Sequence, residues 1–117
     1  MTDLINKSCV SCSSEEQALA NSELAEYLQQ LIGWQVVQGT GTRDALQKLE
    51  KTFTFENYQQ SMDFTNRVAE LAEAEDHHPA LLVEWGKVKV TWWTHAIGGL
   101  HSNDFICAAK TDLLANQ

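Results

Sequence analysis

The hydrophobic residues between positions 14 and 32 recur at the three- and four-residue spacing of an amphipathic helix. The apolar face of this helix holds Leu24, Tyr27, Leu28 and Leu31. Two starts fit the pattern: Ser14, with Gln17 three residues later as a capping box, or Asn21 and Ser22, which are caps closer to the apolar face. The pattern therefore predicts a first helix that ends before Gly33.

After Gly33 the pattern changes to the two-residue period of β-strands. A short strand is predicted over 34–37, and residues 38–41 are typical of a turn into a second strand. One face of the second strand carries Leu49, Lys51, Phe53 and Phe55, and the other carries Glu50, Thr52 and Thr54. We expect a hairpin with one buried face, on which Lys51 is the polar exception.

A long second helix is predicted from Asn57 to about Ala74. Asn57 is a good N-cap, with Gln60 three residues later. The apolar residues of this segment form a broad stripe that we expect to face the core: Tyr58, Met62, Phe64, Thr65, Val68, Ala69, Leu71 and Ala72. The helix must end before Pro79, because the residue that precedes a proline is disfavoured in helical geometry.

Two further strands and a last helix complete the pattern. Strands are predicted over 81–85 and 87–94, on either side of Gly86. The last helix opens at His101 or Ser102, and its inward residues are expected to be Phe105, Ile106, Ala109 and Leu113. This order predicts an α+β fold (α-β-β-α-β-β-α), a four-stranded antiparallel sheet with three helices packed on one face.

The predicted sheet leaves its edges and one whole face uncovered. Helices on a single side cannot cover both faces, and bare strand edges invite pairing with another chain. We therefore expect a homo-oligomer, either a dimer or a tetramer.

Length and composition indicate one globular domain. A chain of 117 residues with 44% hydrophobic and 21% charged residues can build one core and is too short for two. We place the domain at residues 21–117 and expect residues 1–20 to form a flexible N-terminal segment.

Charge and cysteine content narrow the function classes. A net charge of -8 opposes direct binding to nucleic acid or to an anionic membrane surface. No apolar run approaches the roughly 18 to 20 residues of a membrane span, and the first residues lack the apolar core of a secretory signal. Three cysteines, Cys9, Cys12 and Cys107, are an odd number, which fits a reducing compartment and a cytoplasmic location.

Cys9 and Cys12 have the spacing of half a zinc site or of a redox pair. No second pair of ligands follows at a spacing that would complete four. Two reduced thiols in the N-terminal segment are the favoured interpretation.

Three of the four histidines fall where loops or strand ends are predicted: His77, His78 and His95. An imidazole has an unperturbed pKa of about 6.5, so it can both take and give a proton in one turnover. Each residue alone has an ordinary explanation, as a helix end for the histidine pair or as a first-turn carboxylate for Asp104. Their clustering predicts an acid–base site.

A metal centre is the competing interpretation, because histidines and carboxylates can coordinate zinc or iron. Adjacent residues such as His77 and His78 tend to point in different directions. No HxH, HExxH or paired CxxC spacing supplies converging ligands. We therefore expect no metal.

The spacing of these residues also carries a family resemblance. The pattern Glu73-x3-His77-His78-Pro79-x5-Trp85-x9-His95-x8-Asp104 resembles the signature of the pterin-4a-carbinolamine dehydratases. The resemblance covers most of the chain outside the first twenty or so residues, and includes Leu24, Gly33-Trp34, Phe53-x-Phe55, Val68-Ala69 and Asp104-Phe105-Ile106-x-Ala108-Ala109-Lys110.

The resemblance implies a lyase that dehydrates 4a-hydroxytetrahydrobiopterin or a related pterin to the quinonoid dihydropterin, which recycles the cofactor of aromatic amino acid hydroxylases. It implies that His77, His78 and His95 are the active-site histidines. Glu73 and Asp104 fall on carboxylate positions that support or orient them, and no metal or organic cofactor is needed. A hydroxylase is a further candidate partner.

Two points leave alternatives open. The family usually has a tryptophan two residues after the proline, where this chain has Leu81, and Trp92 or Trp93 could replace it. Animal relatives also act as dimerisation partners of a transcription factor, so a non-catalytic interaction protein, a transcriptional coactivator, is the second hypothesis. The intact set of three histidines favours catalysis.

Overall fold

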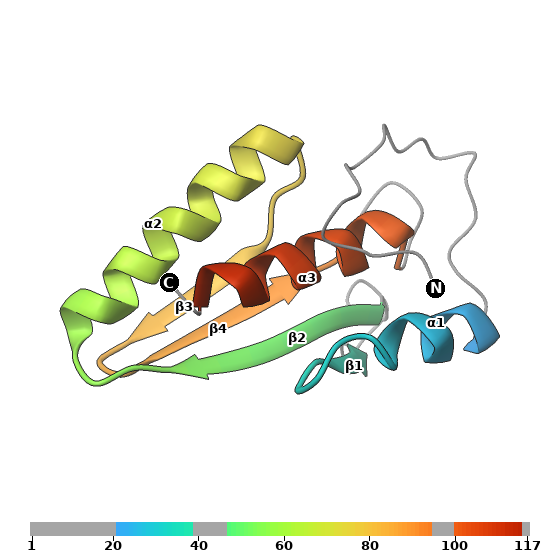
Figure 1. Ribbon diagram of the computed structural model, residues 1–117, viewed down its shortest axis with the longest axis horizontal. Coiled ribbons are helices and arrows are strands. Elements are labelled where there is room, and N and C mark those ends of the chain that lie inside the picture. Colours follow the sequence, from blue (N-terminus) through green and yellow to red (C-terminus); the bar gives the residue numbers. More distant parts are fainter. Residues whose placement is uncertain (1–20, 39–46, 95–99, 116–117) are drawn as a thin grey trace.

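The computed structural model describes residues 21–38, 47–94 and 100–115 (Figure 1). Its elements are α1 (Asn21–Leu28), β1 (Gln35–Gln38), β2 (Gln47–Thr54), α2 (Tyr58–Glu75), β3 (Ala80–Glu84), β4 (Lys87–Trp92) and α3 (Ser102–Ala115). The predicted segment 1–20 with its two cysteines, the choice between two starts of the first helix and most of the turn at 38–41 lie outside the described residues.

The four strands form one antiparallel sheet in the order β1-β2-β4-β3. The three helices lie on one side of this sheet (Figure 1). The α+β prediction is therefore confirmed, and both predicted hairpins are neighbours in the sheet. Because β2 and β4 are the central strands, their inward residues build the floor of the core.

The strand register aligns the inward residues in rows. Leu49 of β2 lies opposite Val36 on one side and Trp92 on the other, and all three face the helices. The helices cover these rows with fully buried side chains, among them Phe64, Val68, Phe105 and Ala108. Tyr27 of α1 stacks on Phe105 of α3 at 5.1 Å between ring centroids, which fixes the first helix to the last.

Lys51, the polar exception of the inward face, donates two hydrogen bonds in the structure. Its Nζ donates to the Oδ1 of Asp112 at 2.8 Å and to the carbonyl of Ile32 at 2.9 Å. The indole Nε1 of Trp34 donates to both oxygens of the same carboxylate at 3.1 Å. Asp112 therefore joins α3 to β2 and to the segment before β1.

The N-cap of α2 is confirmed, but its predicted inward stripe was too broad. The side chain of Asn57 accepts from the N–H of Gln60 at 2.8 Å. Tyr58 is 52% exposed and Ala69 is also exposed, because only residues on the arc around Phe64, Val68 and Ala72 face the sheet and α3. The apolar surface of α2 is therefore divided between the core and solvent.

The last helix is almost wholly buried along its first two turns. Asn103, Asp104 and the residues that follow as far as Ala109 are all buried. Leu113, which was expected to face inward, is 46% exposed, whereas Leu114 and Ala115 beside it pack against the core. Among the described helices, none has the length and apolar composition needed to cross a membrane.

Replacement of Asp112 tests the link between α3, β2 and the segment before β1. In Asp112→Ala both Lys51 and Trp34 lose a charged acceptor, so we expect the free energy of unfolding to fall by about 1–2 kcal/mol. The loss should lie at the lower end of the range for charged hydrogen bonds because the side chains of the ion pair remain 23% and 27% exposed. Urea unfolding at matched protein concentration measures it.

Glu70→Ala is the control, because Glu70 is an exposed acidic residue of α2. This variant should change the unfolding free energy by no more than about 0.5 kcal/mol. Equal stabilities of the two variants would contradict a stabilising role for Asp112.

Candidate active site

The end of α2 places the histidine pair. Asp76 adopts the left-handed conformation, with φ 51° and ψ 43°, and its N–H bonds back to the carbonyl of Ala72. The N–H of His77 donates to the same carbonyl at 3.1 Å. Such bonding satisfies the last carbonyls of a helix and reverses the chain direction. The helix therefore ends at a defined residue, and the histidines follow immediately.

His77 is directed inward and meets a buried carboxylate. Its Nε2 lies 2.6 Å from the Oδ1 of Asp104. The side chain of Asp104 is fully buried and that of His77 is 11% exposed. Hydrogen bonds between ionisable groups in such a dry setting are strong and directional.

The second oxygen of Asp104 is also occupied. Oδ2 accepts from the hydroxyl of Thr94 and from the N–H of His101, each at 2.9 Å. In return, Nδ1 of His101 accepts from the N–H of Asn103 at 3.0 Å. This reciprocal arrangement is a capping box with histidine at the N-cap, so α3 begins at Ser102 and Asp104 is its third residue.

The partners of His77 fix which of its nitrogens carries the hydrogen. A carboxylate oxygen accepts, so Nε2 of the neutral imidazole donates and Nδ1 keeps the lone pair. Nδ1 of His77 has no hydrogen bond within the described part of the chain, and no buried side-chain nitrogen or oxygen there lacks a partner. In this tautomer Nδ1 is the nitrogen left to exchange a proton with a ligand.

An indole lies against the face of the same imidazole. The rings of His77 and Trp92 are parallel to within 7° and their centroids are 5.6 Å apart. Trp92 is fully buried, and its Nε1 donates to the hydroxyl of Thr111 at 3.2 Å. Trp92 therefore contacts the site only from beneath His77.

His78 is directed outward. Its Nε2 lies 2.8 Å from the Oε2 of Glu73, and the two side chains are 57% and 79% exposed. Glu73 lies on the last turn of α2, five residues before this histidine. The two neighbouring histidines thus each have a carboxylate partner, one in the core and one at the surface.

The structure brings four of the predicted site residues into two pairs, His77 with Asp104 and His78 with Glu73. His95 lies outside the described residues. Trp85, which belongs to the signature spacing, is 71% exposed at the β3–β4 turn, at the opposite end of β3 from the histidines. Five strand residues separate the two ends, roughly 16 Å.

Sequence reasoning missed the hydroxyl of Thr94 and the stack on Trp92. Thr94 continues the two-residue alternation of the inward residues Val88, Val90 and Trp92, and this alternation could have predicted that its side chain faces inward. Trp92 was named as a possible replacement for an aromatic residue absent at Leu81. Its complete burial means that it does not form an exposed wall of the site.

No group of three or more histidine, cysteine, aspartate or glutamate side chains that could hold a metal ion occurs within residues 21–38, 47–94 and 100–115. The divergent directions of His77 and His78 agree with this finding, because each imidazole is bonded to a different carboxylate.

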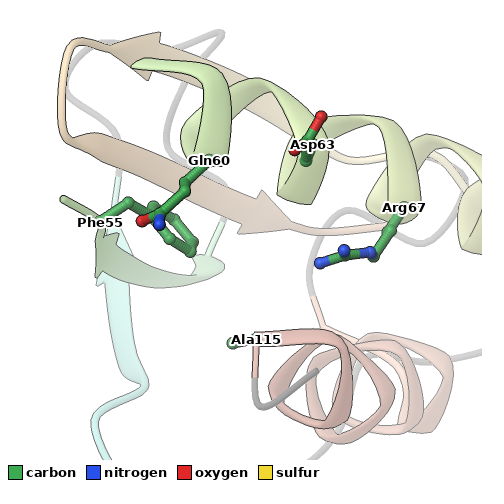
Figure 2. A pocket seen from close by; sticks show the side chains of 5 residues that line it. All are labelled: Phe55, Gln60, Asp63, Arg67 and Ala115. Carbon is green, nitrogen blue, oxygen red and sulfur yellow. The ribbon is translucent and has the colours of Figure 1, made fainter. Parts of the chain in front are cut away.

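A separate pocket of about 260 Å³ lies between the first half of α2 and the end of α3 (Figure 2). Its lining consists of Phe55, Gln60, Asp63, Arg67 and Ala115. Arg67 projects from α2 into the space beside α3 (Figure 2). The part of α2 from Arg67 to its end at Glu75 rises by about 12 Å, and the histidines follow beyond it, so this pocket is distinct from the histidine pairs.

Comparison with known proteins identifies the family. The sequence profile described as pterin 4 alpha carbinolamine dehydratase matches residues 17–114. The chain belongs to the pterin-4-alpha-carbinolamine dehydratase family. A relative from Chlorobaculum tepidum, whose name assigns it provisionally to this activity, is 54% identical over 114 residues, which are 97% of this chain and 99% of the relative.

Two solved structures share the fold. A protein from Brucella melitensis described as a transcriptional coactivator/pterin dehydratase matches with a TM-score of 0.75 and 31% identity, over 85% of this chain and 99% of its own. A pterin dehydratase-like protein described as a RuBisCO assembly factor of the alpha-carboxysome matches with a TM-score of 0.58 and 26% identity, over 73% and 92% of the two chains.

The two carboxylates should differ sharply in their contribution to stability. In Asp104→Asn the amide oxygen can still accept from Thr94 and from the N–H of His101, but the NH₂ group would then face the Nε2–H of His77. We expect this variant to lose about 1–3 kcal/mol of unfolding free energy, because buried hydrogen-bonding groups are left without partners. Urea unfolding monitored by circular dichroism measures the loss.

Glu73→Gln is the matched control at the exposed pair. It should shift the unfolding free energy by no more than about 0.5 kcal/mol, because solvent replaces the lost contact. If both variants had the same free energy of unfolding as the wild-type protein, the buried carboxylate would not contribute to stability.

Proposed function

We propose that this chain is a hydro-lyase that dehydrates a 4a-hydroxytetrahydropterin, with 4a-hydroxytetrahydrobiopterin as the reference substrate, to the quinonoid dihydropterin and water. Membership of the dehydratase family supports the reaction class. The observation that carries the proposal is the His77–Asp104 pair, in which an imidazole lies 2.6 Å from a fully buried carboxylate.

The reaction needs two proton transfers. The 4a hydroxyl must receive a proton to leave as water, and the neighbouring ring nitrogen must lose one as the new C=N bond forms. A general acid and a general base on the two sides of the ring satisfy both requirements. Imidazoles suit both roles because their unperturbed pKa of about 6.5 is close to neutral pH.

The roles follow from the environments of the histidines. His77, held from behind by Asp104, has the fixed direction that proton transfer requires, and we propose it together with His95 as the acid–base pair. His78 is half exposed and held by a surface carboxylate, which suits a residue that binds and positions the pterin. Glu73 and Asp104 orient the imidazoles, and the reaction uses no metal or organic cofactor.

In the cell we propose a cytoplasmic role in tetrahydrobiopterin recycling for an aromatic amino acid hydroxylase. This role rests on the chemistry of the substrate, because the carbinolamine is the pterin product that such hydroxylases release. We propose no direct contact with nucleic acid or membrane, since the net charge of -8 opposes both.

A second candidate is a non-catalytic interaction or assembly protein. The descriptions of the two solved relatives support it, because one is called a coactivator and the other an assembly factor. The histidine–carboxylate pairs favour the enzyme. A spectrophotometric assay of the purified chain with a synthetic 4a-hydroxytetrahydropterin separates the two functions, since only the enzyme accelerates the dehydration.

Substitution of the histidines tests the assigned roles. His77→Ala and His95→Ala should each lower the turnover number by at least about 100-fold, because a general acid or base typically contributes 10²- to 10⁴-fold. His78→Ala should instead raise the Michaelis constant more than it lowers turnover. Steady-state kinetics measures these values, and circular dichroism verifies that each variant is folded.

The double variant of His77 and His95 adds a further check. Its loss should be smaller than the product of the two single losses, because a base contributes little once its acid partner is gone. Normal turnover by folded His77→Ala and His95→Ala would refute the catalytic assignment and favour the interaction protein.

The assembly is also proposed to be a homo-oligomer. β1 and β3 are edge strands, and Leu82 of β3 is 51% exposed on the sheet face opposite the helices. Tyr58, Met62 and Ala69 of α2 add a second line of apolar side chains that are not fully covered within one chain. Unpaired edges and uncovered apolar surface are the usual sites of subunit contact.

Light scattering at micromolar concentration tests the assembly. The expected mass is a dimer or tetramer of the 13.1 kDa chain, because both the sheet edges and α2 have uncovered surface. A single species at the monomer mass would disprove the oligomer.

A further inference from the structure

Trp92 lies under the site without being part of its surface. Its side chain is completely buried on the inward face of β4, and its indole ring is parallel to the imidazole of His77. A residue with no exposed surface cannot touch a substrate. Any influence of Trp92 on the reaction must therefore pass through the position of His77.

The indole is itself held in place by α3. Its Nε1 donates to the hydroxyl of Thr111, and that hydroxyl donates to the carbonyl of Cys107 at 2.7 Å. Thr111 is fully buried and follows Asp104 by seven residues, about two helical turns, so both project from the same side of α3. The helix thus contacts His77 directly through Asp104 and indirectly through Thr111 and Trp92.

The two contacts restrain different motions of the imidazole. The hydrogen bond to Asp104 fixes Nε2 but leaves the ring able to rotate about the line that joins Nε2 to the carboxylate oxygen. A parallel indole opposes that rotation, because tilting the imidazole would break the stack. The direction in which Nδ1 points depends on this second restraint.

The stack can act in both protonation states of His77. Neutral aromatic rings attract one another in offset stacks, and the face of an indole also attracts a cation within about 6 Å of its centroid. The observed separation of 5.6 Å satisfies both conditions. The imidazole therefore keeps its orientation while it gains and loses a proton.

We infer that Trp92 is a positioning residue for His77, and that Thr111 sets the position of Trp92 through its hydroxyl group. The expected effect on the turnover number rests on the proposed dehydratase function. The expected effect on the orientation of His77 does not depend on that function.

Thr111→Val removes the acceptor of Trp92 and keeps the shape of the side chain, whereas Thr111→Ser keeps the hydroxyl. We expect Thr111→Val to lower the turnover number about tenfold with a Michaelis constant within about twofold of wild type, because misplacement of a catalytic group by 1 Å can cost up to 10²-fold. Thr111→Ser should restore most of the rate.

Thr65→Val is the matched control. The hydroxyl of Thr65 donates to the carbonyl of Ser61 at 2.8 Å within α2, so the substitution removes the same kind of bond far from His77 in the helix. Its turnover number should equal that of the wild-type protein. An equal loss in both variants would show that the effect is general destabilisation and would overturn the inference.

Proton NMR of the full chain provides a readout that does not depend on activity. The ring protons of His77, identified by their loss in His77→Ala, should be shifted upfield by the indole and should show cross-relaxation with Trp92. In Thr111→Val the upfield shift should decrease, while the resonances of His78 stay unchanged. Wild-type turnover together with unchanged His77 resonances in folded Thr111→Val would overturn the inference.

If Thr111→Val does not fold, the wild-type spectrum decides the matter, since the absence of both the upfield shift and the cross-relaxation would exclude the stack in solution. If the wild-type chain does not dehydrate the pterin, the proposed function fails. The NMR comparison then still determines whether Thr111 and Trp92 position His77.

Discussion

The carboxylate of Asp104 is the contact on which both the fold and the site depend. It accepts hydrogen bonds from the imidazole of His77 after α2, from the hydroxyl of Thr94 after β4 and from the N–H of His101, the N-cap residue of α3. These groups come from three separate parts of the chain, and they converge only when α3 has docked on the sheet. The side chain is fully buried, so each of its contacts is made without competition from water. Formation of the helix and orientation of His77 are therefore parts of one event.

The fold was predictable because its signals are local. The N-cap at Asn57, the alternation of Leu49, Lys51 and Phe53 and the arrest of α2 before Pro79 each depend on neighbouring residues. The predicted inward face of α2 was too broad because it too rested on local signals. Hydrophobicity alone could not divide its apolar residues between the core and solvent, so exposed Tyr58 was placed with buried Phe64.

The site was predictable only in part. The spacing pattern selected His77, His78, Glu73 and Asp104. The turn at the end of α2 brings these residues into pairs, His77 with Asp104 and His78 with Glu73. Trp92 was named only as a replacement for the tryptophan absent at Leu81, and Thr111 was not selected. The two are nineteen residues apart and meet only through the packing of α3 on β4. A hydroxyl on a buried helix has no sequence signature that distinguishes it from an ordinary core threonine.

Lys51 has a consequence for how the strands find one another. Alternation of polar and apolar residues excludes a shift of one residue between β2 and its neighbours, since such a shift would turn the buried face outward. It cannot exclude a shift of two residues, which preserves the alternation. A lysine on the buried face favours the observed register, because a shift of two residues would move it by about 7 Å from Asp112 and the carbonyl of Ile32. The residue that weakens the hydrophobic pattern thus helps to align the central strand.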